Sequence, residues 1–393
     1  MTAPMRRSLV IAFVAFVAMR LFLSVWAIVV TAIVSTPLDP DPVLRPYYGQ
    51  PALLDGWEGL LLGPWQRFDT LHYMSVAQAG YDVHNSVFPP LYPYAMRAVG
   101  AVIELVTPAP PAVATMLAAL VISNATLVLA LALLHYVTTR QLDQDSATRT
   151  IVYLLLFPTG FFLFAGYSES LFLLFAVASL FAARREEPLW AGIFGFLAAL
   201  TRLTGALLCL PLAYEYARRR SFDWRQIDWR LLGVVLPALG FLAFVVWRSA
   251  LGLPPLSEVY EAFWFQRTGF PGADLWLAMR SLIMGSGPRT GEISLVLDLL
   301  VTALLLASTV VVFRRLGASY ALYNAALLLF MLLPTSDLKP LYSFSRYALV
   351  FFPTFMILGQ AGRRPWINRL ILYSSLILAL FFSGQFFLWG WVA

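Results

Sequence analysis

Residues Leu9 to Val34 read LVIAFVAFVAMRLFLSVWAIVVTAIV, and this stretch decides the class of fold. Its one charged residue is Arg20, which we expect to pair with an internal acid. A helix needs about 20 apolar residues to cross the hydrocarbon core of a bilayer, and this run is longer than that. It is too long for the apolar core of a secretory signal, about 7–15 residues, and has no small-residue cleavage site. We therefore interpret it as a retained first membrane span.

The composition of the whole chain leads to the same class. The 393 residues are 60% hydrophobic and 12% charged, whereas a soluble domain carries about 25% charged residues. The net charge of +6 comes from short basic clusters between apolar runs, which is typical of membrane topology signals and gives no indication of a nucleic-acid partner. Cys209 is the single cysteine, so neither a disulfide framework nor a cysteine metal site is expected.

Applied along the chain, the length criterion predicts an all-α, polytopic integral membrane protein with about 11 membrane segments. Between Leu189 and Ala217 lie two shorter apolar runs of about 13 residues, each worth roughly 20 Å of helix. They are split at Thr201–Gly205 and are interpreted as a hairpin. The remaining spans are predicted near residues 9–34, 112–139, 149–166, 168–183, 231–250, 293–313, 318–335, 346–361 and 367–389.

The positive-inside rule gives the orientation of these segments. With the hairpin counted as two segments, every arginine cluster, including Arg218–Arg220, falls on the cytoplasmic side together with the N-terminus. The long loops 36–111 and 252–292 then face outward. We predict a first module, residues 1–230, that carries the catalytic loop, and additional transmembrane helices in residues 231–393.

The first outward loop is predicted to contain two short interfacial helices and the residues that carry chemistry. Helical spacing favours Phe68–Ala79, with Leu71, Met74 and Ala77 on one face, and Tyr92–Val106. A candidate pair for proton transfer, Asp69 and His72, lies at the start of the first of these helices.

A sugar transfer to a hydroxyl requires a base, and an aspartate can serve as one. Asp is also a common N-cap of a helix, and His72 could be only a structural hydrogen-bonding group, so both interpretations stay open at this point.

A series of motifs resembles the phosphatidylinositol-glycan class V (PIG-V) family, the second mannosyltransferases of GPI-anchor assembly. The resemblance covers roughly the first 210 residues, and two positions depart from the family pattern: Phe68 replaces a Trp, and Pro89 replaces a frequent Phe. The matching segments are Arg67-Phe68-Asp69, His72-Tyr73, Gly80-Tyr81, Phe88-Pro89 with Pro93, Phe157-Pro158-Thr159, Ala165 to Phe172, and Leu200 to Gly205.

The resemblance implies a GT-C-type glycosyltransferase fold and an inverting transfer of mannose from a polyprenyl phosphate. It implies that Asp69, in the first outward loop, is the base, that His72 is its partner or a substrate ligand, and that Arg67, Tyr73 and Tyr81 bind substrate. No cofactor is expected; a divalent metal is compatible with this class, but no residue pattern indicates one. No Asp-x-Asp motif and no glycine-rich phosphate loop indicates a nucleotide-sugar site.

A lipid-phosphate donor needs a cation near its phosphate. Arg202 at the hairpin tip is the first candidate, since an arginine at membrane depth is costly and can bind a phosphate bidentately. Alternatively, it pairs with an acid or extends to the interface. Arg346 is the second candidate. Glu169, in a turn between two spans, is predicted to bind a sugar hydroxyl, support His72 or pair with Arg202; the alternative is a solvated turn carboxylate.

The sequence therefore predicts an enzyme that transfers mannose from a polyprenyl-phosphate donor to a hydroxyl of a lipid or glycan acceptor on the exoplasmic side. The expected location is a bacterial plasma membrane, or the endoplasmic reticulum if the source is eukaryotic, with membrane lipids as surroundings. The alternative is a multi-pass lipid or solute transporter or flippase. Against it, transporters often show two related halves with broken helices in both, and this sequence shows no related halves.

Overall fold

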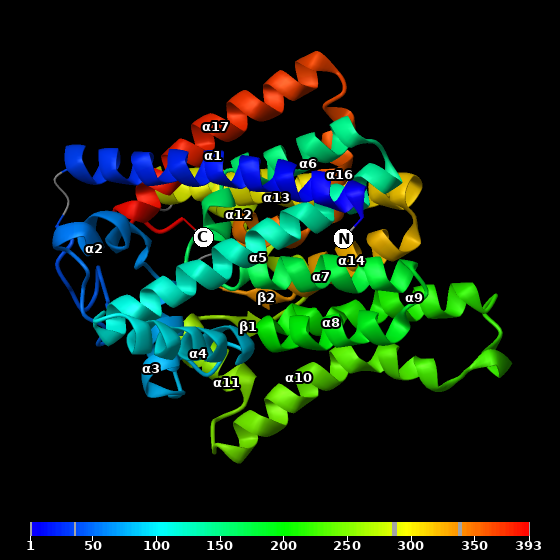
Figure 1. Cartoon of the computed structure of the whole chain (residues 1–393), viewed down its shortest axis with the longest axis horizontal. Helices are drawn as coiled ribbons and strands as arrows, with labels where there is room; N and C mark the ends of the chain where they lie inside the picture. Colours follow the sequence, from blue (N-terminus) through cyan, green and yellow to red (C-terminus); the bar gives the residue numbers. More distant parts are fainter. Residues whose placement is uncertain (1, 35–36, 285–288, 337–339, 393) are drawn as a thin grey trace. The chain divides into compact units, whose positions relative to one another are not determined.

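Helices make up almost all regular structure of the chain (Figure 1). The computed structural model describes residues 2–34, 37–284, 289–336 and 340–392. Packing divides the chain into two compact units: residues 1–174 with 358–392 form unit 1, and residues 175–357 form unit 2. These units are defined by packing, and the functional division that the sequence analysis places at residue 230 stays a prediction.

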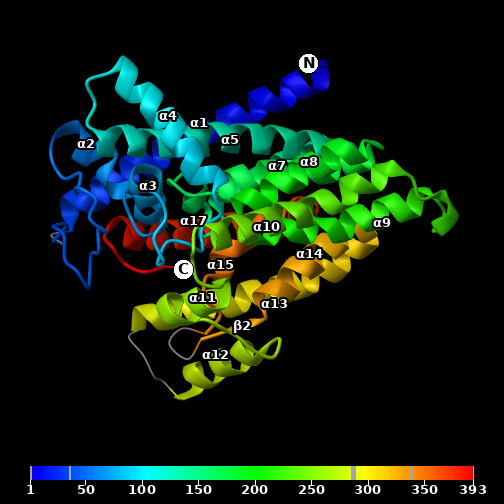
Figure 2. The ribbon, with the colours of Figure 1, turned by 90° about the horizontal axis from the view of Figure 1, so that it is seen from below.

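Unit 1 is built on three long helices, α1 (Ala3–Ile33), α5 (Pro111–Gln141) and α17 (Pro365–Phe387). α1 packs against both α5 and α17. Its remaining elements are α2 (Gly56–Leu61), η1 (Gly63–Trp65), α3 (Asp69–Ala79), α4 (Leu91–Val106), α6 (Gln144–Leu156) and η2 (Gly160–Leu163), while α7 (Glu169–Arg184) continues into unit 2. Figures 1 and 2 both show α3 and α4 beside one end of α5.

The two helices predicted in the first long loop are confirmed as α3 and α4. The predicted face of α3 is buried: Leu71 and Met74 are fully buried and Ala77 nearly so. Gly166 explains how closely the neighbouring turn approaches α3, because a Cβ on it would lie 2.8 Å from Thr70 Cγ2 and 3.0 Å from Ala119 Cβ. This packing fixes the start of α3 against α5 and the turn before α7.

Unit 2 contains the predicted hairpin. Its first arm is α8 (Pro188–Thr201), and the 3-10 segment η3 (Leu203–Leu208) connects it to the second arm, α9 (Cys209–Arg219). The two arms are antiparallel, because Ala191 near the start of α8 shares a core cluster with Tyr216 near the end of α9. The other elements are η4 (Trp224–Gln226), η5 (Trp229–Leu231), α10 (Leu232–Ala250), α11 (Leu256–Trp264), β1 (Arg267–Thr268), α12 (Ala273–Met284), α13 (Arg289–Leu316), α14 (Ala318–Met331), β2 (Pro334–Thr335), α15 (Phe344–Tyr347) and η6 (Ala348–Val350).

Small residues bring α8 and α10 together along their length (Figure 1). A side chain on Gly192 would collide with the backbone of Gly233, and one on Gly240 would lie 2.8 Å from the carbonyl oxygen of Phe196. Close backbone approach through small residues is the usual way in which helices associate in membranes.

Among the residues that the structure describes, five helices are long and apolar enough to cross a membrane: Ala3–Ile33, Pro111–Gln141, Trp229–Ala250, Ile293–Leu316 and Pro365–Phe387. Their exposed faces carry large apolar side chains, such as Val14 and Leu21 of α1, as expected where lipid is the solvent. The protein is therefore a multi-pass membrane protein. The total of about 11 segments stays a prediction, because α8 and α14 have 14 residues each and are shorter than a full crossing.

The sequence analysis did not predict two breaks and one pairing. The expected span 149–166 ends as a helix at Leu156, because Pro158 forces Phe157 into extended backbone. The expected span 346–361 is divided into α15, η6 and α16 (Phe352–Ala361), with Pro353 at the start of α16. In unit 2, β1 and β2 form a small antiparallel ladder that pairs Arg267 with Thr335. The chain is therefore mostly helical rather than strictly all-α.

Candidate active site

A strained turn places Asp69 at the head of α3. Asp69 is the first residue of this helix, and Phe68 takes the N-cap position without any side-chain cap. The N-cap interpretation of Asp69 is therefore wrong. Phe68 has φ +48° and ψ −120°, a backbone conformation that costs a bulky residue about 1–3 kcal/mol and is concentrated at functional sites. The Asp69 side chain is buried, with 7% exposure, at a helix N-terminus that favours negative charge.

His72 lies one turn after Asp69 in a cluster of rings. The His72 ring stacks at 5.4 Å on Phe88, and its centroid lies 4.2 Å from that of Tyr48 and 4.9 Å from that of His84. Burial, and then the nearby His84, lower the pKa of His72 to about 3. His72 is consequently a neutral imidazole at physiological pH, able to donate one hydrogen bond and accept another.

Tyr48 and His84 are site residues that the sequence analysis did not single out. Burial, and then the charge of Asp69, raise the pKa of Tyr48, so its phenol lies within electrostatic reach of that carboxylate. One signal was available in the sequence: two of its three histidines, His72 and His84, lie in the same loop. Nothing in the sequence indicated Tyr48, which packs against both histidines.

Arg67 is held inside unit 1 and supports the strained turn. Its guanidinium donates from Nε and Nη2 to the carbonyl oxygen of Phe387, at 3.3 and 3.2 Å, and from Nη1 to the carbonyl oxygen of Gln66 at 3.0 Å. It also lies 4.9 Å from the ring centroid of Trp389. Burial lowers its pKa to about 10, so it remains charged at neutral pH. These contacts are those of a positioning residue, and its predicted role as a substrate ligand stays untested.

The predicted ligands Tyr73 and Tyr81 are engaged in bonds within unit 1. The Tyr73 hydroxyl shares a hydrogen bond of 2.8 Å with Ser168 Oγ, and the Tyr81 hydroxyl donates to the carbonyl oxygen of Phe88 at 2.8 Å. The first bond ties α3 to the turn that precedes α7, while the second closes the loop around Phe88. Their roles as substrate ligands stay predictions.

Glu169 is the first residue of α7 and is completely buried. The alternative of a solvated turn carboxylate is therefore wrong. Its neighbours are polar: the preceding Ser168 bonds Tyr73, and Tyr92 bonds Ser123 Oγ at 2.7 Å. Burial raises the pKa of Tyr92 well above its ordinary value, and the charges of Tyr73 and Glu169 add to that rise. The structure thus brings Glu169 near Tyr92, which packs against Tyr73 of α3.

Unit 2 brings the two predicted phosphate-binding arginines onto one ring. The Arg202 guanidinium lies 5.1 Å and that of Arg346 5.6 Å from the centroid of the Tyr347 ring. Arg202 directly follows the last residue of α8, and Arg346 belongs to α15 and is buried with 7% exposure. The structure thus brings two guanidinium groups to one aromatic ring, and the buried Asp298 accepts a hydrogen bond from the backbone N–H of Ser345, next to Arg346.

Two further arrangements concern charge in the described residues. Arg20 donates to the carbonyl oxygen of Phe164 at 3.3 Å and lies 4.5 Å from the ring centroid of Trp65. The expected internal acid is therefore replaced by a carbonyl and an aromatic face. Among the described residues, no group of three or more His, Cys, Asp or Glu side chains is placed to hold a metal ion. Whether the activity of the protein depends on a metal ion stays untested.

The long apolar helices define a multi-pass membrane protein. The family model described as mannosyltransferase (PIG-V) matches residues 6–215, which is more than half of the chain. The chain belongs to this family, and it is a membrane glycosyltransferase. No curated protein sequence matches it. Family membership decides between the two interpretations of the sequence in favour of the enzyme over the transporter.

Comparison with solved structures gives distant similarities. ArnT from Cupriavidus metallidurans, in a crystal structure with undecaprenyl phosphate, has 16% identity and a TM-score of 0.49, over 96% of this chain and 76% of that chain. The archaeal oligosaccharyltransferase AglB from Archaeoglobus fulgidus, in complex with an inhibitory peptide and a dolichol-phosphate, has 10% identity and a TM-score of 0.40. That match covers 94% of this chain and 56% of AglB.

Proposed function

We propose that this enzyme transfers mannose from a polyprenyl phosphate to a hydroxyl group of a lipid or glycan acceptor, with inversion at the sugar. The bond between the anomeric carbon and the phosphate oxygen breaks, and its electron pair leaves with the phosphate. The acceptor oxygen forms the new bond to the anomeric carbon from the opposite face. The acceptor proton passes to the carboxylate of Asp69, which is the general base.

The observation that carries this proposal is the placement of Asp69. In a chain of the mannosyltransferase family, a strained turn aims a buried carboxylate from the first residue of α3, within reach of Tyr48 and one turn from His72. Phe68, and not Asp69, occupies the N-cap position of α3. Strain of this kind persists only where surrounding contacts hold it, and it is expected where a reacting group must be aimed.

His72 has a supporting role in this proposal. With a pKa near 3 it carries no charge at neutral pH, so it cannot be the acid that protonates the departing phosphate. A neutral imidazole can instead fix the acceptor hydroxyl, or the carboxylate of Asp69, through a hydrogen bond. A polyprenyl phosphate needs no protonation to leave, because the phosphate is a stable anion, and this suits a site with a single base.

The donor phosphate is proposed to bind Arg202 and Arg346. Two guanidiniums provide charge-assisted, bidentate hydrogen bonds to a phosphate group, and this is the geometry in which arginine exceeds lysine. Both arginines lie at the ring of Tyr347. The site is proposed to face outward, where a lipid-linked sugar is presented at the outer leaflet and nucleotide sugars are not available.

The test is a transfer assay with purified protein, polyprenyl-phosphate mannose and a lipid extract, followed by mass spectrometry of the mannosylated product. Asp69→Asn is expected to reduce single-turnover transfer by about 10²–10⁴, the usual contribution of positioned acid–base catalysis. Asn is close in size and keeps α3, so the thermal unfolding midpoint should change little. A parallel assay with a metal chelator tests metal dependence.

Two control variants make the assay decisive. Asp69→Glu retains a carboxylate and should retain part of the activity, since a displacement of about 1 Å can cost about 10²-fold. Asp55→Asn, in the same loop, removes an equal charge from an exposed side chain that makes no cap bond and should leave transfer unchanged. A folded Asp69→Asn protein with normal transfer would remove Asp69 from the role of base. Absence of any mannosylated product with wild-type protein, for every acceptor, would overturn the proposed donor.

A further inference from the structure

A second charged site lies in unit 2, at the ends of α8, α9 and α10. An open pocket of about 320 Å³ is lined there by the end of α9, the loop into α10 and the turn before α8. Among the described residues, three arginines and three carboxylates line it: Arg219, Arg220 and Arg230, and Glu186, Glu215 and Asp228. No residue of the candidate active site takes part. The question is which of these charges are already neutralised.

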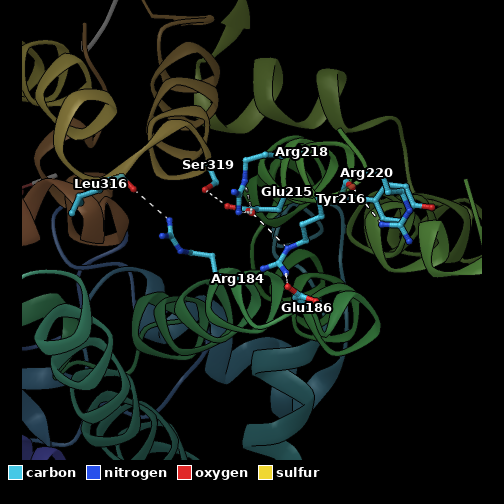
Figure 3. Close-up of polar contacts among 9 residues, drawn as sticks. Arg184, Glu186, Glu215, Tyr216, Arg218, Arg220, Leu316 and Ser319 are labelled. Atoms are coloured by element: carbon cyan, nitrogen blue, oxygen red, sulfur yellow. Dashed lines mark hydrogen bonds and ion pairs between the residues drawn. The ribbon is translucent and has the colours of Figure 1, made fainter. Parts of the chain in front are cut away.

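Each of the three carboxylates forms an ion pair with an arginine, and two of them also accept a hydrogen bond from a hydroxyl group. Glu215, 3% exposed, accepts from Arg218 Nη2 at 2.7 Å and from Ser319 Oγ at 2.5 Å (Figure 3). Asp228 accepts from Arg220 Nη2 at 2.8 Å and from the Tyr216 hydroxyl at 3.0 Å. These bonds also fold the loop between α9 and α10.

Arg220 is fully used in that loop. Besides the pair with Asp228, its Nε donates to the carbonyl oxygen of Gln226 at 2.9 Å, and its guanidinium lies 3.7 Å from the centroid of the Tyr216 ring. Arg220 therefore positions the wall of the cavity and is not available to a ligand.

Arg219 and Arg230 keep unused donors in the cavity. Within the described part of the chain, the buried Nε of Arg219 has no hydrogen-bond acceptor, although it lies 3.9 Å from Glu215 Oε2. The ion pair of Arg219 with Glu186 involves a carboxylate whose side chain is 78% exposed. An exposed pair of this kind contributes little and is readily exchanged for another anion. The side chain of Arg230 makes no ion pair or hydrogen bond with any described residue, although it lines the cavity. Burial, and then the charge of Arg184, lower the pKa of Arg219.

The surroundings of the cavity identify the ligand as a lipid. The loop beside it exposes Phe222, Ile227 and Trp229, and the candidate membrane span Trp229–Ala250 begins at its edge. A pocket at the end of a span lies at the depth of the headgroups, and exposed aromatic residues at that level contact acyl chains and interface. Arginine clusters next to a span attract anionic lipid.

We propose that this cavity binds the headgroup phosphate of an anionic phospholipid, through Arg219 and Arg230. The phosphate replaces Glu186 as the partner of Arg219, and Phe222, Ile227 and Trp229 contact its acyl chains. Phosphatidic acid and phosphatidylglycerol fit this site better than phosphatidylcholine, because the choline ammonium would lie among arginines. The site is separate from the proposed donor-phosphate ligands, Arg202 and Arg346.

The test measures lipid binding to the purified full-length protein by native mass spectrometry and by titration of mixed micelles. Wild-type protein should bind phosphatidic acid and phosphatidylglycerol more tightly than phosphatidylcholine. The double variant Arg219→Gln with Arg230→Gln should raise the Kd for both anionic lipids by about tenfold or more, the cost of losing charge-assisted hydrogen bonds. The matched control, Arg314→Gln with Arg315→Gln, removes two exposed charges at the end of α13 and should change the Kd little.

Two single variants keep the proposal falsifiable. Arg230→Gln alone removes no contact within the described structure, so its fold should be preserved while its Kd rises. Glu186→Gln releases Arg219 and should tighten anionic lipid binding a few-fold. Equal Kd values for the double variant and the control would overturn the proposal. So would binding of inorganic phosphate at this site without binding of either anionic lipid, or weaker lipid binding by Glu186→Gln.

Discussion

The depressed pKa of His72 predicts how the stability of the protein depends on pH. Burial lowers this pKa from 6.5 to about 3, so the unfolded chain binds a proton between these pH values and the folded chain does not. The free energy of unfolding is therefore unaffected by His72 above about pH 6.5 and falls as the pH drops through that window. At pH 5 the loss is about 2 kcal/mol, since one pKa unit corresponds to about 1.4 kcal/mol.

His72→Gln tests this prediction because glutamine does not titrate. A loss of about 2 kcal/mol lowers the unfolding midpoint of a chain of this size by about 2–3 °C between pH 7.5 and pH 5. The variant should lose that part of the pH dependence, even if it is less stable at pH 7.5. The measurement is the thermal midpoint in one detergent at both pH values. His84→Gln is the control, because His84 is less buried and should change the slope less. Equal slopes for wild type and His72→Gln would refute the buried neutral imidazole.

Three further predictions concern other parts of the chain. Arg202→Ala should weaken the apparent affinity for the lipid donor by about 10- to 150-fold, and Arg202→Lys should recover only part of it, which donor titration measures. Gly192→Ala should destabilise the protein by about 1–3 kcal/mol, because the added methyl group meets the backbone of Gly233; a thermal midpoint equal to wild type would contradict the tight α8–α10 contact. A single cysteine at position 220, in a Cys209→Ser background, should resist an impermeant thiol reagent added to intact cells, and its labelling from outside would contradict the predicted topology.

The parts of the fold that local physics determines were predictable from the sequence. Apolar runs of membrane length gave the five long helices, and helical spacing gave α3 and α4 within the first loop. The interruption at Thr201–Gly205 predicted the end of α8. The structure explains why a glycine is required at position 205, because a side chain there would collide with the backbone of Ala198 and Ala199. Each of these signals lies within about one helix length of the feature that it predicts.

The partners of the site residues were not predictable, because they depend on contacts between distant segments. Arg67 binds the carbonyl oxygen of Phe387, 320 residues away. Every residue has a backbone carbonyl, so the sequence does not indicate which one will accept this hydrogen bond. Tyr48 reaches His72 only because its loop folds back, with positive φ at Tyr48 and Gly49. The resemblance to the family identified Asp69 and His72 but gave no information on the residues that hold them.

The C-terminal end of α17 explains why the turn before Asp69 can remain strained. The Phe68 ring packs at 5.8 Å on Phe386 and at 5.5 Å on both Trp389 and Trp391, while Arg67 bonds the carbonyl oxygens of this same end of the helix and of Gln66. A conformation that costs about 1–3 kcal/mol needs contacts of this extent to persist. These aromatic residues lie outside residues 6–215, the part that matches the family model. The matched part therefore supplies the carboxylate, and the last residues of the chain supply the packing that fixes its direction. An aspartate on a relaxed turn would lack that fixed direction, and proton transfer tolerates little displacement of its base.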